Sequence, residues 1–449
     1  MSNTVTIQLP IDVINIIDTI TKAGYEAFAV GGCIRDRLLN KEPEDYDITT
    51  SATPDEVKAL FRRTVDTGIE HGTVTVMIGD TGYEVTTYRI DGKYEDSRHP
   101  KDVTFTKTLR EDLLRRDFTI NAMAYNDTVG LVDPFDGCVD LDKKIIRCVG
   151  NPRERLKEDA LRIMRAVRFS AQLGYKIEEE TFKAMKELSP NLANISEERI
   201  QVELVKLVIS NHPEKLVTAY ECGLTAVFMP EFDAIMNCSQ NHPHHCYSVG
   251  MHTIKCMETV RADKYLRLAM LFHDIGKPLT KSVDEEGIEH FHGHPAESKR
   301  LCKDILKRLK FDNHTIDIVS KLVGYHDYPV TLTHKGIRKA LNEMGEDIFP
   351  LVMEIKKADI LSQSTYKREE KLKKLSDIDI LYKEVLESNC CVSLKNLSVN
   401  GKDLIGLGYP STPVLGQELG KLLDRVIEEP TLNSKDILLE LAREDLRNA

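Results

Sequence analysis

The sequence predicts an α+β fold in which a mixed sheet occupies the N-terminal third and helices form the rest. Two observations carry this prediction. Short β-branched segments alternate with helical segments over the first 150 residues. From Pro152 onward, apolar residues recur at helical spacing almost without interruption. The chain has 449 residues, which gives room for about three domains of ~150 residues each.

The elements of the first part can be placed from their local signals. Gly24 suits the left-handed position after a helix, and Thr53 with Pro54 forms a helix start. Gly79 lies between two β-branched runs, as in a hairpin. The predicted order is a helix at 11–24, a strand at 25–32, a helix at 33–40, a strand at 44–51, a helix at 53–61, a hairpin at 72–89 and a polar loop at 90–103.

The second part is predicted to be helical. A helix over 151–174 has Pro152 at its first position and Gly174 at its exit, and a capped helix follows at 196–210. A histidine-rich region, roughly from His242 to His326, and the charged segment 357–449 continue the helical pattern.

Composition limits the functional classes. Hydrophobic residues make up 41% and charged residues 30%, as in a soluble globular protein. The formal net charge of -11 argues against broad, non-specific nucleic-acid binding, although a local basic patch is compatible with it, because screening limits charge interactions to roughly 10 Å. No apolar run approaches the ~18 residues of a membrane span, and no signal peptide is visible. Ten scattered cysteines fit reduced thiols, so we expect a cytoplasmic protein without a membrane partner.

The strongest local signal is VGGCIRD followed by EDYDIT. Glycines at 31 and 32 let the backbone approach a ligand, and the following helix N-terminus with Arg35 can meet phosphate oxygens. Asp45 and Asp47 lie two apart on a predicted strand and therefore share a face. Their mutual repulsion favours a hard divalent cation such as Mg²⁺. A turn followed by solvent-facing acids is the alternative.

The stretch KEDALRIMRAVRF, residues 157–169, predicts a helix with one apolar and one charged face. A solvated face would explain the charges without any function. However, a carboxylate accepts from the exocyclic amine of cytosine or adenine, while a guanidinium donates to the neighbouring ring nitrogen. An Asp and an Arg one turn apart can therefore imitate a complementary base and disfavour uracil and guanine.

Five segments in order resemble a known family. VGGCIRDRLLN with EDYDIT is similar to the signature of the class II tRNA nucleotidyltransferase and poly(A) polymerase family, a branch of the polymerase β-like nucleotidyltransferases. LLRRDFTINAMAYN, LVDPFDGCVDLDKKIIRCVG, KEDALRIMRAVRF and SEERIQVEL resemble its later motifs. The resemblance implies catalysis by Asp45 and Asp47 with Mg²⁺, and selection of CTP and ATP by Asp159 and Arg162. It also implies nucleotide contacts by Gly32, Arg35, Arg116, Arg165 and Arg168.

The resemblance leaves the product open between related activities. The favoured reaction is template-independent addition of CCA to the 3′ end of tRNA, with release of pyrophosphate. Loop 91–103 (DGKYEDSRHPKDV) matches the flexible element of enzymes that add the final A, which does not separate full CCA addition from addition of A alone. A poly(A) polymerase is less favoured, because the chain end, REDLRNA, is not strongly basic. Glu84 is a candidate third carboxylate or an ordinary strand residue.

A second constellation lies in the histidine-rich region. The order H…HD…H…H…D resembles the HD-domain metal-dependent phosphohydrolases, and imidazole with carboxylate suits Mn²⁺, Fe²⁺, Ni²⁺ or Mg²⁺. The resemblance implies one metal held by His252, His273, Asp274 and Asp359, with His294 and His326 for a second divalent transition metal or a phosphate. A helical domain with satisfied histidines is the alternative, and a chain that is mainly a phosphohydrolase is another. The histidines of 242–245 are expected in a surface loop.

These expectations define an arrangement of domains and partners. We expect a nucleotidyltransferase head at 1–150, a helical neck at 151–230, an HD domain at 231–360 and a tRNA-binding tail at 361–449. The expected partners are tRNA, CTP and ATP, with RNA bound through shape and phosphate contacts. No sequence feature indicates the oligomeric state.

Overall fold

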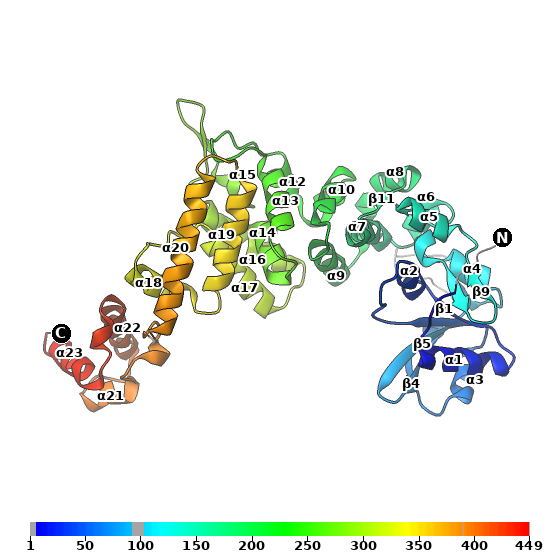
Figure 1. The fold of residues 1–449 in the computed structure, drawn as a ribbon, viewed down its shortest axis with the longest axis horizontal. Coiled ribbons are helices and arrows are strands. Elements are labelled where there is room, and N and C mark those ends of the chain that lie inside the picture. Colours follow the sequence, from blue (N-terminus) through cyan, green and yellow to red (C-terminus); the bar gives the residue numbers. More distant parts are fainter. Residues whose placement is uncertain (1–5, 92–102, 389, 449) are drawn as a thin grey trace. The chain divides into compact units, whose positions relative to one another are not determined.

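The computed structural model describes residues 6–91, 103–388 and 390–448. The chain divides into two units, Met1–Asp233 with Arg308–Lys310 and Ala234–Lys307 with Phe311–Ala449. The predicted α+β class is confirmed, because the large sheet lies in the first part and the second unit is almost entirely helical (Figure 1).

A seven-stranded mixed sheet forms the centre of the first part, in the order β3-β4-β5-β2-β1-β8-β9. Strand β2 pairs antiparallel with β1 and parallel with β5, which joins the N-terminal strands to the β4–β5 hairpin. The strands are β1 (Ala27–Val30), β2 (Asp47–Thr50), β3 (Thr64–Gly68), β4 (Thr73–Ile78), β5 (Thr81–Thr87), β8 (Ala124–Asn126) and β9 (Gly130–Val132).

Helices cover both faces of this sheet. In Figure 1, α1 (Ile11–Lys22) and α3 (Pro54–Leu60) lie on one side and α2 (Gly32–Leu38) on the other. Apolar side chains of α1 recur at helical spacing and are buried: Val13, Ile16, Ile17 and Ile20. Helix α3 begins with the expected Thr53 cap, and Glu56 completes a capping box. The predicted hairpin is confirmed, with Ile78 opposite Thr81.

The predicted helix over 151–174 is wrong in one respect, because it is two helices. Helix α6 (Pro152–Glu158) ends at Asp159, whose backbone is extended (φ -139°, ψ 106°), and α7 (Leu161–Leu173) starts afresh. The Asp159 carboxylate accepts from the Leu161 N–H, which is the local hydrogen bond by which aspartate competes with helix. Asp159 and Arg162 are therefore not on one continuous helix.

Further short helices complete the first unit. Helices α7 and α9 pack against each other. The remaining elements up to the end of α12 are α4 (Leu109–Leu114), α5 (Gly137–Lys143), β10 (Ile145–Ile146), β11 (Lys176–Ile177), α8 (Glu179–Leu188), α9 (Glu197–Val208), α10 (Leu216–Glu221), α11 (Thr225–Phe228) and α12 (Pro230–Met236).

The second unit is a helical assembly followed by a helical tail. Helix α13 packs against α14 and α19, and α14 against α17. Its helices are α13 (Val249–Thr259), α14 (Lys264–Phe272), α15 (Lys277–Thr280), α16 (His294–Arg308), α17 (Asn313–Tyr325), α18 (His334–Met344), α19 (Phe349–Ser362), α20 (Arg368–Glu387), α21 (Gly401–Gly406), α22 (Pro413–Glu428) and α23 (Lys435–Arg447). A short β12 (Ser282–Val283) pairs with β13 (Glu289–His290). The last three helices share an apolar core around Leu404, Leu422 and Leu438.

Two further predictions concern the polar loop at 90–103 and the absence of a membrane span. Most of the predicted polar loop, residues 92–102, lies outside the described residues. Its two ends are held together, because β6 (Arg89–Asp91) pairs antiparallel with β7 (Val103–Phe105). Within the described part of the chain, no helix has the length and apolar character to cross a membrane.

Candidate functional site

Three carboxylates of the head share one region of the sheet. Asp47 opens β2, and the parallel register of Ile48 with Val85 sets Asp47 beside Glu84 of β5. Asp45 precedes the strand instead of lying in it, but the exposed–buried–exposed sequence Asp45, Tyr46, Asp47 still directs both acids to one side. The surrounding protein partly desolvates the Asp47 carboxylate and raises its pKa, although the residue keeps an exposed edge, and the charges of Asp45 and Glu84 raise it further. This crowding of negative charge is what a divalent cation would relieve.

Arg116 brings positive charge to the same region. Its guanidinium opposes the rise in the Asp47 pKa and lies 3.8 Å from buried Asp112. The Gly31 backbone leaves room for it: a Cβ at Gly31 would come within 2.8 Å of an Arg116 guanidinium nitrogen. Gly31 has a φ of +85°, which favours glycine, and Gly32 begins α2 directly after it. The turn thus brings backbone amides, a guanidinium and the Asp47 carboxylate close together.

Asp159 has a partner that the sequence did not reveal. Arg199 of α9 donates to the Asp159 carboxylate at 2.7 Å, so the break between α6 and α7 is held by the neighbouring helix. Arg162 donates to Glu158 at 2.5 Å and to the Arg115 carbonyl oxygen at 3.1 Å. Arg199 lies in SEERIQVEL, one helical turn before Glu203. This spacing of opposite charges is the one sequence signal that could have indicated Arg199 as a site residue.

The other arginines of α7 are ion-paired with nearby acids. Arg165 donates to Asp117 at 2.8 Å and lowers the pKa of that carboxyl, despite its burial, to about 2. Arg168 is 7% exposed and donates to Glu203 of α9 at 2.7 Å. The predicted charged face is therefore partly buried: Arg168 lies inside the protein at the contact between α7 and α9, and half-buried Arg165 is paired with Asp117 of the head.

Phe169 connects these arginines with the Gly-Gly turn. The guanidinium carbons of three arginines lie over its ring: Arg168 at 3.7 Å, Arg35 at 5.1 Å and Arg165 at 5.3 Å. Cations over an aromatic face are attracted by its quadrupole. Arg35 also donates to Asn121 at 2.7 Å and to Asp36 at 2.8 Å. The arginines predicted from separate motifs thus meet at one ring.

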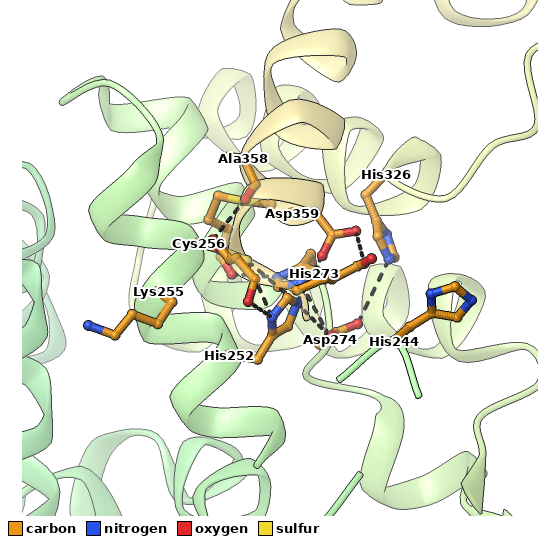
Figure 2. Close-up of polar contacts among 12 residues, drawn as sticks. His244, His252, Lys255, Cys256, His273, Asp274, His326, Ala358 and Asp359 are labelled. Atoms are coloured by element: carbon orange, nitrogen blue, oxygen red, sulfur yellow. Dashed lines mark hydrogen bonds and ion pairs between the residues drawn. The ribbon is translucent and has the colours of Figure 1, made fainter. Parts of the chain in front are cut away.

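The second unit brings all the predicted HD residues together. Figure 2 shows His252 of α13, His273 and Asp274 after α14, His326 after α17 and Asp359 of α19 converging. His294 begins α16, and its Nε2 lies 3.1 Å from that of His326. Among the described residues, two groups have ligand atoms that all lie within 4.8 Å of one another inside the group. The first is His252, Cys256, His273 and Asp359, and the second is Asp274, His294 and His326.

Backbone carbonyls fix the tautomers of these histidines. A carbonyl oxygen can only accept, so each Nδ1 that contacts one must carry the proton. Such contacts are His273 with Met270 at 2.7 Å, His326 with Val323 at 2.7 Å, His294 with Phe291 at 2.8 Å and His252 with Ser362 at 3.4 Å. In the neutral ring each Nε2 is then a lone pair that faces the cluster.

Some of these lone pairs face other acceptors. Burial lowers the pKa of His326 to about 3 and also lowers that of His294, so their facing Nε2 atoms are both unprotonated at neutral pH. Two lone pairs at 3.1 Å repel unless a cation lies near them. The residues present therefore fit a divalent metal.

Asp274 and Lys277 join the two groups. One Asp274 oxygen lies 3.2 Å from His273 Nε2, and the other lies 3.4 Å from His294 Nε2. Buried Lys277, in FHDIGKP, lies 2.7 Å from the Asp274 carboxylate and donates to Gln240 at 2.8 Å. The sequence pattern did not indicate a role for this lysine. The buried pair of charges orients a carboxylate that can bridge two ions.

Two open cavities lead to the cluster. One, of about 350 Å³, is lined by Lys277, His294 and His242. The other, of about 310 Å³, is lined by His326, Asp359 and Lys356. The histidines of 242–245 do lie in a loop, but His245 is half-buried, with its ring centroid 5.2 Å from that of His252. The loop forms part of the wall of the site.

Three family models match successive parts of the chain. A family model described as the poly A polymerase head domain matches residues 27–147. A second, a probable RNA- and SrmB-binding site of polymerase A, matches 174–236, and the HD domain matches 244–364.

Full-length relatives then define the family. The CCA-adding enzyme of Enterococcus faecalis is 35% identical over 95% of this chain and 94% of its own length. That of Ligilactobacillus salivarius is 35% identical over 95% of both chains. The match to the Limosilactobacillus reuteri enzyme is stronger, 54% identity, but spans 44% of this chain and about half of that relative's length. The chain belongs to the family of CCA-adding enzymes, which confirms the resemblance seen in its motifs.

Solved structures show the same fold. A Bacillus stearothermophilus CCA-adding enzyme in complex with CTP superposes with a TM-score of 0.73 at 28% identity, covering 97% of both chains. A Thermotoga maritima CCA-adding enzyme complexed with tRNA has a TM-score of 0.58 at 19% identity, a likeness of fold.

Proposed function

We propose that this chain adds CCA to the 3′ end of tRNA without a nucleic-acid template, using CTP and ATP and releasing pyrophosphate. The observation that carries this proposal is full-length similarity to CCA-adding enzymes together with intact acids at 45 and 47. The 3′-hydroxyl oxygen of the tRNA bonds to the α-phosphorus of the nucleotide, and its proton is released to water. The bond from that phosphorus to the bridging oxygen breaks, and pyrophosphate leaves with its electron pair.

Asp45 and Asp47 would hold Mg²⁺ in this reaction, with Glu84 beside them. The donor set is all oxygen, which suits this ion. When bound, it would neutralise the triphosphate and the developing charge on the leaving group. Arg116 and the amides after Gly31, which lie close to each other, would bind phosphate oxygens.

Nucleotide choice is assigned to the break between α6 and α7. Asp159 would accept from the exocyclic amine of cytosine or adenine, and Arg162 would donate to the ring nitrogen. Asp159 has an extended backbone, so it and Arg162 lie where the chain turns from α6 into α7. Arg199 of α9 holds the Asp159 carboxylate in this turn. Arg35, Arg165 and Arg168 would lie around the nucleotide, with Phe169 holding their guanidinium groups together.

The partition of the chain follows the same proposal. We assign the head to 1–150, the neck to 151–230, the HD domain to 231–360 and the tRNA-binding tail to 361–449, with the helical parts contacting RNA mainly through phosphates. All ten cysteines are free in the structure, which supports our expectation of a reducing, cytoplasmic setting.

The experiment is extension of a tRNA that lacks its 3′ CCA, with Mg²⁺, CTP and ATP, by the wild type and by Asp47→Asn and Asp45→Asn. We expect the wild type to extend the tRNA and each variant to lose nearly all activity, because amides cannot supply the anionic ligands. Asp66→Asn, at an exposed ion pair with Lys58, is the matched control. Extension by both carboxylate variants at the wild-type rate would refute the assignment.

The HD unit supports a second candidate function, hydrolysis of a phosphoester. The facing lone pairs of His294 and His326 and the bridging position of Asp274 favour a metal centre. Incubation with bis(p-nitrophenyl) phosphate and Mn²⁺ or Ni²⁺ tests this, with His273→Ala as the inactive reference. No metal-dependent release of nitrophenol would reject a hydrolase role and leave the transferase proposal untouched.

A further inference from the structure

Cys256 lies among the HD ligands although the sequence pattern contains no cysteine. It is one turn after His252 on α13, which puts both side chains on one face of the helix. Its Sγ is fully buried and lies 3.5 Å from His252 Nε2 (Figure 2). Together with His273 and Asp359 it completes a set of four ligand atoms that lie within 4.8 Å of one another.

Cysteine side chains are often buried simply because they are small and apolar. At this position the surroundings are different. Buried Nε2 of His273 has no hydrogen-bond donor and faces an Asp274 oxygen at 3.2 Å, while its Nδ1 is committed to the Met270 carbonyl oxygen at 2.7 Å. A lone pair in the protein interior without a donor is costly. It is directed into the group that contains Cys256.

His252 gives a second, independent observation. Its Nδ1 contacts the Ser362 carbonyl oxygen, so Nε2 is the acceptor in the neutral ring. That Nε2 lies 2.8 Å from an Asp359 oxygen and 3.5 Å from the Cys256 sulfur. His252 Nε2, the Asp359 oxygen and the Cys256 sulfur therefore converge in the protein interior, where a metal ion would take the place of a proton between them.

The donor set indicates which cation. Two imidazoles, one sulfur and one carboxylate are the ligands of tetrahedral Zn²⁺ and of chemically similar ions, while Mg²⁺ prefers oxygen. The neighbouring group of Asp274, His294 and His326 has no sulfur. The two groups thus differ in chemistry although they lie side by side.

We propose that Cys256 is a thiolate ligand of the first HD metal, so that this position selects Zn²⁺, Co²⁺ or Fe²⁺ over Mg²⁺, while the second position is an ordinary nitrogen–oxygen site. The inference rests on the proposed metal centre and is independent of CCA addition and of hydrolase activity.

Cobalt is the probe that reports sulfur ligation directly. The full-length protein, freed of metal and titrated with Co²⁺, should develop an intense near-ultraviolet band from charge transfer between thiolate and cobalt. Cys256→Ser should lack this band and bind Zn²⁺ at least about tenfold more weakly, as expected when a ligand is lost. Cys302→Ser, which alters another fully buried cysteine of the same unit outside both groups, should retain the band and the affinity.

The outcomes separate the inference from the metal centre itself. Cobalt bound by the wild type with visible bands but without the sulfur band would overturn the role of Cys256 and leave the histidine site standing. If Cys256→Ser does not fold, X-ray absorption at the zinc edge of the wild type decides. A sulfur neighbour at about 2.3 Å supports the proposal, and a shell of nitrogen and oxygen alone refutes it.

Discussion

Asp159 occupies the end of one helix and the approach to the next, with its carboxylate held by Arg199 at 2.7 Å. We predict that Asp159→Ala relaxes nucleotide choice. Losing one base-edge acceptor removes about 1–3 kcal/mol of discrimination, so selectivity for CTP over UTP should fall by about 10- to 100-fold. Competition assays with labelled CTP and UTP on a tRNA lacking CCA measure this ratio.

Glu187→Ala is the control for that substitution. It removes an exposed ion pair with Arg153 in the same part of the chain and should leave the ratio unchanged. If Asp159→Ala lowers the overall rate while the CTP-to-UTP ratio stays at the wild-type value, the carboxylate is structural and does not read the base.

At the residue scale, the sequence motifs indicated candidate site residues but not the side chains that contact them. The motifs indicated Asp159, Arg162, Arg165 and Arg168, but not that Arg168 is buried against Glu203. Such a contact depends on the packing of α7 against α9, which no local pattern encodes. Cys256 was missed for a related reason: one helical turn relates it to His252, but its approach to Asp359 of α19 is a tertiary contact.

The turn between β1 and α2 is the element that brings the head motifs together. We predict that Gly31→Ala raises the KM for CTP and lowers the midpoint of thermal unfolding. The new Cβ would meet the Arg116 guanidinium at 2.8 Å, and the backbone at φ +85°, ψ -129° is a sparsely populated conformation that disfavours a side chain by about 1–3 kcal/mol. Steady-state kinetics and calorimetry measure both effects.

Gly79→Ala separates these two causes. Gly79 also has a positive φ, +59°, but a Cβ there meets no atom within 4 Å. It should lower the unfolding midpoint without changing the KM for CTP. An equal change of KM in both variants would show that backbone strain, and not displacement of Arg116, is responsible.

Elements were predictable where a cap or an alternation marks them, and less so where a side chain interrupts a regular pattern. The capped helix at Thr53 and the hairpin around Gly79 were confirmed. The prediction of one helix over 151–174 was wrong at Asp159. Apolar spacing continues across the break, but the Asp159 carboxylate accepts a hydrogen bond from the Leu161 N–H, which competes with the helix. The exception falls at the residue to which we assign nucleotide choice.

At the scale of the whole molecule, Zn²⁺ should stabilise the HD unit and not the all-oxygen site of the head. A ligand that binds only the folded state at about 100 times its dissociation constant adds about 2.7 kcal/mol. We predict that chelation lowers the unfolding midpoint of one calorimetric transition and that Zn²⁺ restores it. His273→Ala should abolish this response. A chelator effect that persists in His273→Ala would place the stabilising metal elsewhere.

Because the two proposed sites lie in different units, we expect CCA addition and phosphoester hydrolysis to be separable. His273→Ala removes a proposed metal ligand in the second unit, while Asp45 and Asp47 lie in the first. We therefore expect this variant to keep the wild-type rate of CCA addition, measured on a tRNA lacking its 3′ end, while it loses metal-dependent phosphoester hydrolysis. Loss of both activities in a folded variant would contradict their independence.

Sequencing of product ends tests the central claim most directly. A tRNA without its 3′ CCA is incubated with the full chain, Mg²⁺ and all four nucleoside triphosphates at equal concentrations, and every 3′ end is sequenced. The account predicts ends that terminate in CCA and extend no further. A lone A, a long A tail, a mixed sequence or unextended ends would contradict it.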